Sequence, residues 1–107
     1  MGIQMSKSKI TQGEKSSEKG IKITVKFLSA WPSIIGNNKT INLYIENNTS
    51  VLDLLNFLNK KYGDAFSQIR DMIVVLINDQ HINALNGLNT ILKENDNVLM
   101  FLIFGGG

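Results

Sequence analysis

The chain contains a single long helical pattern, and its other periodic segments alternate with the two-residue period of strands. Its fold must therefore combine one main helix with several strands. Residues 51–62 place apolar side chains at the i, i+3, i+4, i+7 and i+11 spacing of a helix that buries one face. Ser50 suits the N-cap, Asp53 puts a negative charge in the first turn, and Gly63 suits the C-terminal end. The apolar stripe consists of Val51, Leu54, Leu55, Leu58 and Tyr62.

Four further segments carry the patterns of strands. Residues 21–27 and 40–46 alternate apolar and polar side chains, and a loop over residues 30–39 joins them into a predicted hairpin. Residues 73–77 are continuously apolar, which predicts a central strand buried on both faces of a sheet. Residues 98–104 form the last predicted strand, and only glycines follow it.

The order of these elements predicts an α+β domain over residues 21–104. A hairpin, a helix and two later strands are the arrangement of a β-grasp (ubiquitin-like) fold, in which one main helix packs on one face of a mixed sheet. Residues 1–20 are polar and nearly empty of large apolar side chains, so we expect a disordered N-terminal arm. Residues 105–107 are expected to be a flexible glycine tail. The length of 107 residues suits one such domain.

Composition excludes several classes of function. The absence of cysteine excludes a disulfide, a thiolate metal site and a cysteine nucleophile. His81 has no second ligand nearby, so we expect a structural or solvated histidine and no metal site. No apolar run approaches the roughly 20 residues that span a bilayer, and no secretory signal is present, which predicts a cytoplasmic protein without a membrane partner.

The charge distribution argues against binding to nucleic acid. Residues 1–20 hold four lysines and two glutamates, which accounts for the whole formal net charge of +2. The remainder of the chain is neutral and lacks the basic stripe of a nucleic-acid-binding face.

The C-terminal glycines are the candidate reactive site. A carboxylate at Gly107 could be activated as an adenylate, and glycine at 105 and 106 would allow the end to enter a narrow partner active site, because glycine has no Cβ. The alternative is an ordinary loose terminus, in which glycine is common.

Large apolar side chains beside this tail are candidates for partner contact. They are Phe101, Ile103 and Phe104, because alternate positions of a strand would leave some of them exposed. Tyr44 is a weaker candidate for the same surface. We expect Trp31 to pack against the edge of the core, in preference to the alternative that it contacts a partner.

Several short motifs resemble a known family. They are residues 23–28 (Ile-Thr-Val-Lys-Phe-Leu), 49–55 (Thr-Ser-Val-Leu-Asp-Leu-Leu), 74–79 (Val-Val-Leu-Ile-Asn-Asp), 93–98 (Lys-Glu-Asn-Asp-Asn-Val) and the terminal Gly106-Gly107. Together they resemble the ubiquitin-like sulfur carriers, most closely the small subunits of molybdopterin synthases.

This resemblance implies a cycle with two protein partners. An E1-like adenylyltransferase would use ATP to adenylate Gly107, and sulfur would then convert the end to a thiocarboxylate. The tail would enter the large subunit of molybdopterin synthase and deliver sulfur for molybdenum cofactor biosynthesis. The chain would hold no permanently bound cofactor and would be a co-substrate that is not catalytic alone. A ubiquitin-like protein modifier, a carrier for tRNA or thiamine thiolation, and a β-grasp interaction module with incidental glycines remain alternatives.

Overall fold

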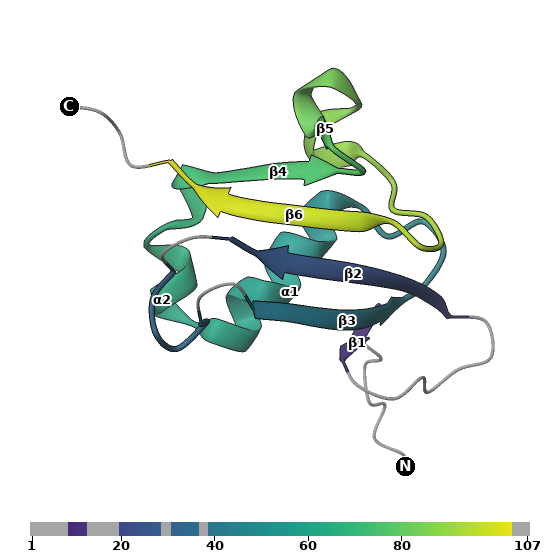
Figure 1. Cartoon of the computed structure of the whole chain (residues 1–107). Coiled ribbons are helices and arrows are strands. Elements are labelled where there is room, and N and C mark those ends of the chain that lie inside the picture. The colour runs from purple at the N-terminus through teal and green to yellow at the C-terminus, as the bar shows by residue number, and fades with distance from the viewer. Residues whose placement is uncertain (1–8, 13–19, 29–30, 37–38, 104–107) are drawn as a thin grey trace, which may run out of the picture.

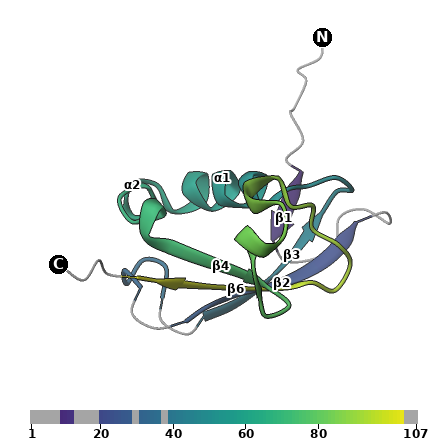
Figure 2. The same ribbon diagram turned by 90° about the horizontal axis from the view of Figure 1, so that it is seen from above.

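The computed structural model describes residues 9–12, 20–28, 31–36 and 39–103, and these form one six-stranded sheet with helices on one face (Figures 1 and 2). The strands are β1 (Ile10–Gln12), β2 (Ile21–Phe27), β3 (Lys39–Ile45), β4 (Ile73–Ile77), β5 (Gln80–His81) and β6 (Asn97–Leu102). The helices are α1 (Val51–Tyr62) and α2 (Asp64–Ser67), with 3-10 turns η1 (Arg70–Met72), η2 (Ile82–Ala84) and η3 (Gly87–Asn89).

The sheet is mixed, and its strand order is β1-β3-β2-β6-β4-β5. The hairpin partners β2 and β3 are antiparallel, β6 runs parallel to β2, and β4 runs antiparallel to β6. The parallel pair requires a crossover, and α1 lies in it. The predicted α+β, β-grasp architecture is therefore confirmed, and β3 begins and ends one residue earlier than predicted.

Helix α1 begins and ends where its sequence signals predicted. The Asp53 backbone N–H donates to the Ser50 hydroxyl at 3.1 Å, and the Ser50 backbone N–H donates to the Asp53 carboxylate at 3.0 Å, which completes a capping box. The Gly63 N–H donates to the Asn59 carbonyl and closes the last turn. All five residues of the predicted apolar stripe are buried against the sheet. Among the described residues, no helix has both the length and the apolar character needed to cross a membrane.

The capping box predicts a defined acid sensitivity. The hydrogen bond from the Ser50 backbone holds the pKa of Asp53 below its ordinary value of 3.8, and Lys9 lowers it further. A depressed pKa stabilises the fold above the unfolded-state pKa, and this contribution is lost as the pH falls through the lower, folded-state pKa. We expect Asp53→Asn to make acid unfolding less steep below roughly pH 4, followed by circular dichroism. Equal slopes for the two proteins would contradict this account.

The structure places a strand inside the segment that was expected to be disordered. β1 pairs antiparallel with the outer edge of β3, with Ile10 opposite Ile45, and the Ile10 side chain is only 2% exposed. The expectation of disorder over residues 1–20 is therefore wrong at residues 10–12. The polar composition of the segment predicted disorder. The burial of Ile10 and the backbone pairing with the edge of β3 are enough to order these three residues.

The prediction for β4 needs a second correction. β4 lies near one edge of the sheet, followed only by the two-residue β5, and is not central. Val75 and Ile77 are buried under the helices, whereas Val74 and Leu76 are half-buried on the opposite, helix-free face. The run is continuously apolar because its second face belongs to an apolar surface patch, described below.

An aromatic cluster joins the end of α1 to the sheet. The Phe27 ring meets the Trp31 ring edge-on at 4.9 Å between centroids and the Tyr62 ring at 6.3 Å. Tyr62 also stacks on Phe66 at 6.4 Å. The Trp31 indole N–H donates to the Leu28 carbonyl at 2.8 Å, and Trp31 is 5% exposed, so it folds onto the core as expected.

The Tyr62 hydroxyl is buried, and no group of the described residues hydrogen bonds to it. Burial also raises the pKa of this phenol. We expect Tyr62→Phe to raise the free energy of unfolding by about 1 kcal/mol, because the variant no longer buries an unpaired hydroxyl. Urea denaturation would measure the change. Tyr44→Phe, at a half-exposed ring, is the matched control and should change stability by less than about 0.5 kcal/mol. A destabilised Tyr62→Phe protein would contradict the prediction.

Candidate functional site

Strand β6 holds the backbone in place up to the start of the glycine tail. It pairs with β2 on one side and β4 on the other, and it buries Val98, Met100 and Leu102 under the helices. Beyond the strand, the Ile103 N–H donates to the Met72 carbonyl at 2.9 Å. The predicted site residues Phe104, Gly105, Gly106 and Gly107 lie outside the described residues. What the structure does describe is a fixed base from which these residues continue.

A polar network fixes the other end of β6. The buried Asp96 carboxylate accepts a hydrogen bond from the Asn78 side-chain amide at 2.9 Å and another from the Lys93 N–H at 2.8 Å. The Asn97 N–H donates to the Asn78 side-chain oxygen at 3.0 Å, and the Asn78 N–H donates to the Asn97 carbonyl. The turn after β4 is thereby joined to the turn before β6, which sets the register of β6 and hence the place where the tail begins.

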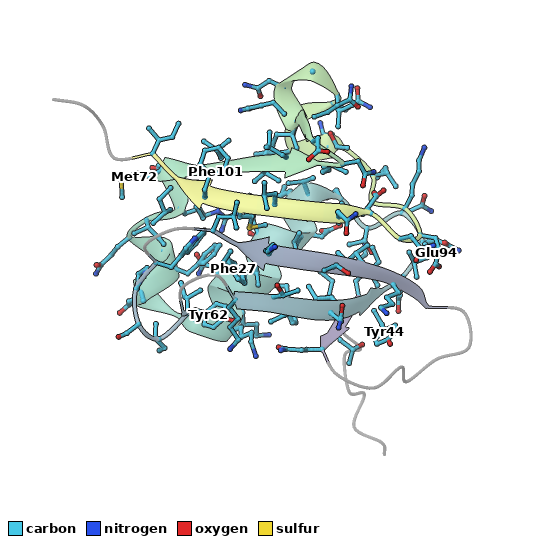
Figure 3. All side chains as sticks on the ribbon, in the orientation of Figure 1. Phe27, Tyr44, Tyr62, Met72, Glu94 and Phe101 are labelled. Carbon is cyan, nitrogen blue, oxygen red and sulfur yellow. The ribbon has the colours of Figure 1, made fainter. Side chains whose placement is uncertain are left out.

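This network predicts a large stability effect at Asp96. Asp96→Ala removes a charged acceptor and leaves the Asn78 amide and the Lys93 N–H without it, which should lower the free energy of unfolding by about 2–4 kcal/mol. Glu94→Ala, at an exposed side chain of the same turn (Figure 3), is the control and should cost less than about 0.5 kcal/mol. Equal losses for the two variants in denaturant melts would contradict this role of Asp96.

An apolar patch lies on the helix-free face of the sheet and reaches the C-terminal end of β6. Phe101 is opposite Val74 and Leu99 is opposite Leu76, so the outward side chains of β4 and β6 form two adjacent pairs. These four side chains are half-buried, and Ile103 at the end is 54% exposed. We call this surface the open-face patch; its members are Val74, Leu76, Leu99, Phe101 and Ile103.

The patch contains two of the three side chains predicted for partner contact, Phe101 and Ile103. Tyr44 lies on the same side of the sheet but far from Phe101, toward the opposite end (Figure 3), so it does not belong to the patch. Sequence reasoning missed Val74, Leu76 and Leu99. The continuous apolar run of β4 could have indicated Val74 and Leu76, because a strand with one solvated face needs apolar side chains only at alternate positions.

The neighbouring half of the same face is polar. Thr24 and Lys26 of β2 and Thr40 of β3 contribute polar side chains to a hollow of about 360 Å³, which Asp79, Asn97, Val98 and Leu99 also line. The Thr24 hydroxyl donates to the Asn42 side-chain oxygen at 3.2 Å. The open face is therefore apolar near the tail and polar beyond β6, an arrangement that would orient a docking partner.

The described residues contain no cluster of three or more side chains able to hold a metal ion. His81 is exposed, and its ring Nδ1 accepts a hydrogen bond from the Asn83 N–H at 2.9 Å, which caps η2. The expectation of a structural or solvated histidine agrees with this position. Within the described residues, the candidate site consists of the open-face patch at the C-terminal end of β6.

Comparison with known proteins gives this arrangement a family. The model of the ThiS family matches residues 34–107. No curated protein matches the chain. The fold resembles that of the protein HVO 2177 from Haloferax volcanii, with a TM-score of 0.69 and 20% identity over 89% of this chain and 94% of that chain.

Two further solved structures are similar. One is the small archaeal modifier protein 1 from Methanosarcina acetivorans, with a TM-score of 0.64 and 25% identity over 82% of this chain and 98% of that one. The other is a chain in the complex of subunits 1 and 2 of the molybdopterin-converting factor from Helicobacter pylori, with a TM-score of 0.52 and 21% identity over 81% and 100%. The chain thus belongs to the ThiS family and has the ubiquitin-like sulfur-carrier fold.

Proposed function

We propose that this chain carries sulfur as a thiocarboxylate on Gly107. The supporting observation is geometric: the backbone is hydrogen bonded as far as Ile103, where the open-face patch ends, so a partner docked on the patch would lie next to the last described residue before the glycines. Glycines at 105–107 allow close approach of backbone to a partner active site.

The proposed loading reaction needs ATP and a sulfur donor but no cofactor bound to this chain. The Gly107 carboxylate attacks the α-phosphorus of ATP within an E1-like adenylyltransferase, and pyrophosphate leaves. A sulfide equivalent then attacks the acyl carbon, AMP leaves, and a thiocarboxylate remains. All catalytic side chains lie on the partner, so the chain serves as a co-substrate and is not an enzyme alone. We expect the cycle to run in the cytoplasm.

The proposed delivery step takes place in the large subunit of molybdopterin synthase. There the tail would transfer its sulfur to a pterin precursor during molybdenum cofactor biosynthesis. The similarity to a chain in the complex of molybdopterin-converting factor subunits supports this choice, as does membership of the ThiS family. The similarity to a small archaeal modifier protein favours one alternative, in which an amine on a target protein attacks the adenylate and forms an amide.

Two parallel incubations distinguish sulfur transfer to the pterin from conjugation to proteins. The thiocarboxylated chain is incubated with the large subunit and pterin precursor in one vessel. In the other, the chain with its free carboxylate is incubated with an activating enzyme, ATP and lysine-bearing proteins. Sulfur carriage for molybdopterin predicts one sulfur lost from the chain per sulfur gained by the pterin, and no lysine adducts. Adducts without transfer to the pterin would overturn the molybdopterin assignment in favour of the modifier.

A further inference from the structure

The N-terminal strand β1 sits in a groove that could receive a strand from another protein. Figure 1 shows β1 beside β3, at the edge of the sheet remote from β4 and β5. We call the space between this edge of β3 and helix α1 the β3–α1 groove; its hollows are lined by residues 9–12 and by residues of α1. This edge is the place where an extended peptide could add to the sheet by backbone hydrogen bonds.

The contacts of β1 show what kind of segment the groove accepts. The Glu46 N–H donates to the Lys9 carbonyl at 3.0 Å, which aligns the segment antiparallel to β3. The Ile10 side chain is buried opposite Ile45. The Lys9 ammonium lies 3.4 Å from the Asp53 carboxylate at the start of α1. These contacts suit a cation followed directly by an aliphatic side chain.

Among the described residues, β1 leaves part of the groove open. It pairs only with Leu43, Tyr44 and Ile45, and within the described part of the chain no strand pairs with the outer edge of residues 39–42. Two hollows remain between β1 and the helix. One of about 230 Å³ lies beside Phe57, and another of about 360 Å³ lies beside Gln12.

The unfilled part of the groove has its own chemistry. The hollow beside Gln12 is lined by the Phe57 ring and by Lys60 and Lys61, whose stems are apolar and whose ends are cationic. Gln12 is opposite Leu43 and shares the helix-facing side with Ile10, because alternate residues of a strand point the same way. An aliphatic side chain at this position would occupy part of the hollow, and an acidic one two residues later would approach the two lysines.

We propose that the β3–α1 groove is a docking site for an extended segment of a partner protein, with β1 as its tethered competitor. The segment would run antiparallel to β3 with the pattern cation, aliphatic, any residue, aliphatic, any residue, acid. A longer segment of this pattern makes more backbone hydrogen bonds and fills more of the groove than β1 does. The site lies across the sheet from the open-face patch, so both surfaces can be occupied together.

The test uses a probe peptide, Ser-Lys-Ile-Thr-Leu-Thr-Glu-Ser, and a control of the same composition with Lys and Glu exchanged. Two variants are designed to remove β1 from the groove. One is the chain without residues 1–12; the other is full-length Ile10→Glu, which is used if the truncated chain does not fold. Binding is followed by amide chemical shifts in NMR titrations. The expected perturbations lie at Tyr44, Glu46, Asp53 and Phe57.

The proposal predicts that the probe binds the freed groove at least tenfold more tightly than it binds the unaltered chain, and at least tenfold more tightly than the exchanged peptide. Equal binding of the two peptides, perturbations on the open-face patch, or no binding to a folded groove-free protein would overturn it. A dimer of the unaltered chain that Ile10→Glu dissociates would also overturn it, because the groove would then receive a second copy. None of these outcomes depends on the sulfur chemistry.

Discussion

Removal of Gly106 and Gly107 is expected to abolish sulfur loading altogether. Two extended residues span about 7 Å, so the shortened end would stop that far from the α-phosphorus of ATP in a docked activating enzyme. Misplacement by even about 1 Å can cost a hundredfold in rate, so no thiocarboxylate should form. The measurement is the amount of sulfur bound to the chain after incubation with activating enzyme, ATP and sulfide.

The deletion should leave the fold unchanged, because β6 ends at Leu102 and the last backbone hydrogen bond among the described residues is made by the Ile103 N–H. Thermal melts of the two proteins should therefore coincide. Removal of residues 1–8, at the other end of the chain, is the matched truncation and should load sulfur normally. A shortened chain that still loads at the full rate would contradict the need for Gly106 and Gly107 in the loading reaction.

Substitution of Phe101 by glutamate is expected to give the second large effect. The ring lies on the open-face patch opposite Val74, beside the start of the tail. A docked partner would bury the new carboxylate without a counter-charge, so we expect binding to the activating enzyme and to the large subunit to weaken at least a hundredfold, or about 2.8 kcal/mol. Isothermal titration calorimetry with each partner would measure the loss.

Tyr44→Glu is the matched control for this substitution. It changes an aromatic residue to the same acid on the same face of the sheet, but at the end far from the tail (Figure 3). Its effect on both affinities should stay within about threefold, the range typical of charges outside an interface core. Equal losses for Phe101→Glu and Tyr44→Glu would show that the patch is not the docking surface.

The elements predicted correctly are those whose signal is local and periodic. The α1 stripe, its Ser50 cap and the alternation in β2 each repeat over several turns or pleats, so the sequence carries them redundantly. β1 has three residues and one buried side chain, which is too short for any period. β1 is ordered through its contacts with β3 and α1, which are distant in sequence. Such tertiary contacts cannot be predicted from a local sequence pattern.

The candidate site was predicted in part. Phe101 and Ile103 were expected on the outer face because alternation along the last strand must expose some of its apolar side chains, and their contact with a partner stays a prediction. Val74 and Leu76 were missed because an apolar run looks the same whether its second face is covered by helices or forms a surface patch. The roles of Gly105, Gly106 and Gly107 stay predictions.

The mass of the intact chain tests the central proposal most directly. After incubation with activating enzyme, ATP and a sulfur donor, exchange of one oxygen for sulfur should add about 16 Da, because sulfide displaces AMP from the acyl adenylate. Fragmentation should locate this addition at Gly107, and omission of ATP should prevent it. An unchanged mass under conditions in which the enzyme consumes ATP with this chain, or an addition located elsewhere than at Gly107, would contradict the account.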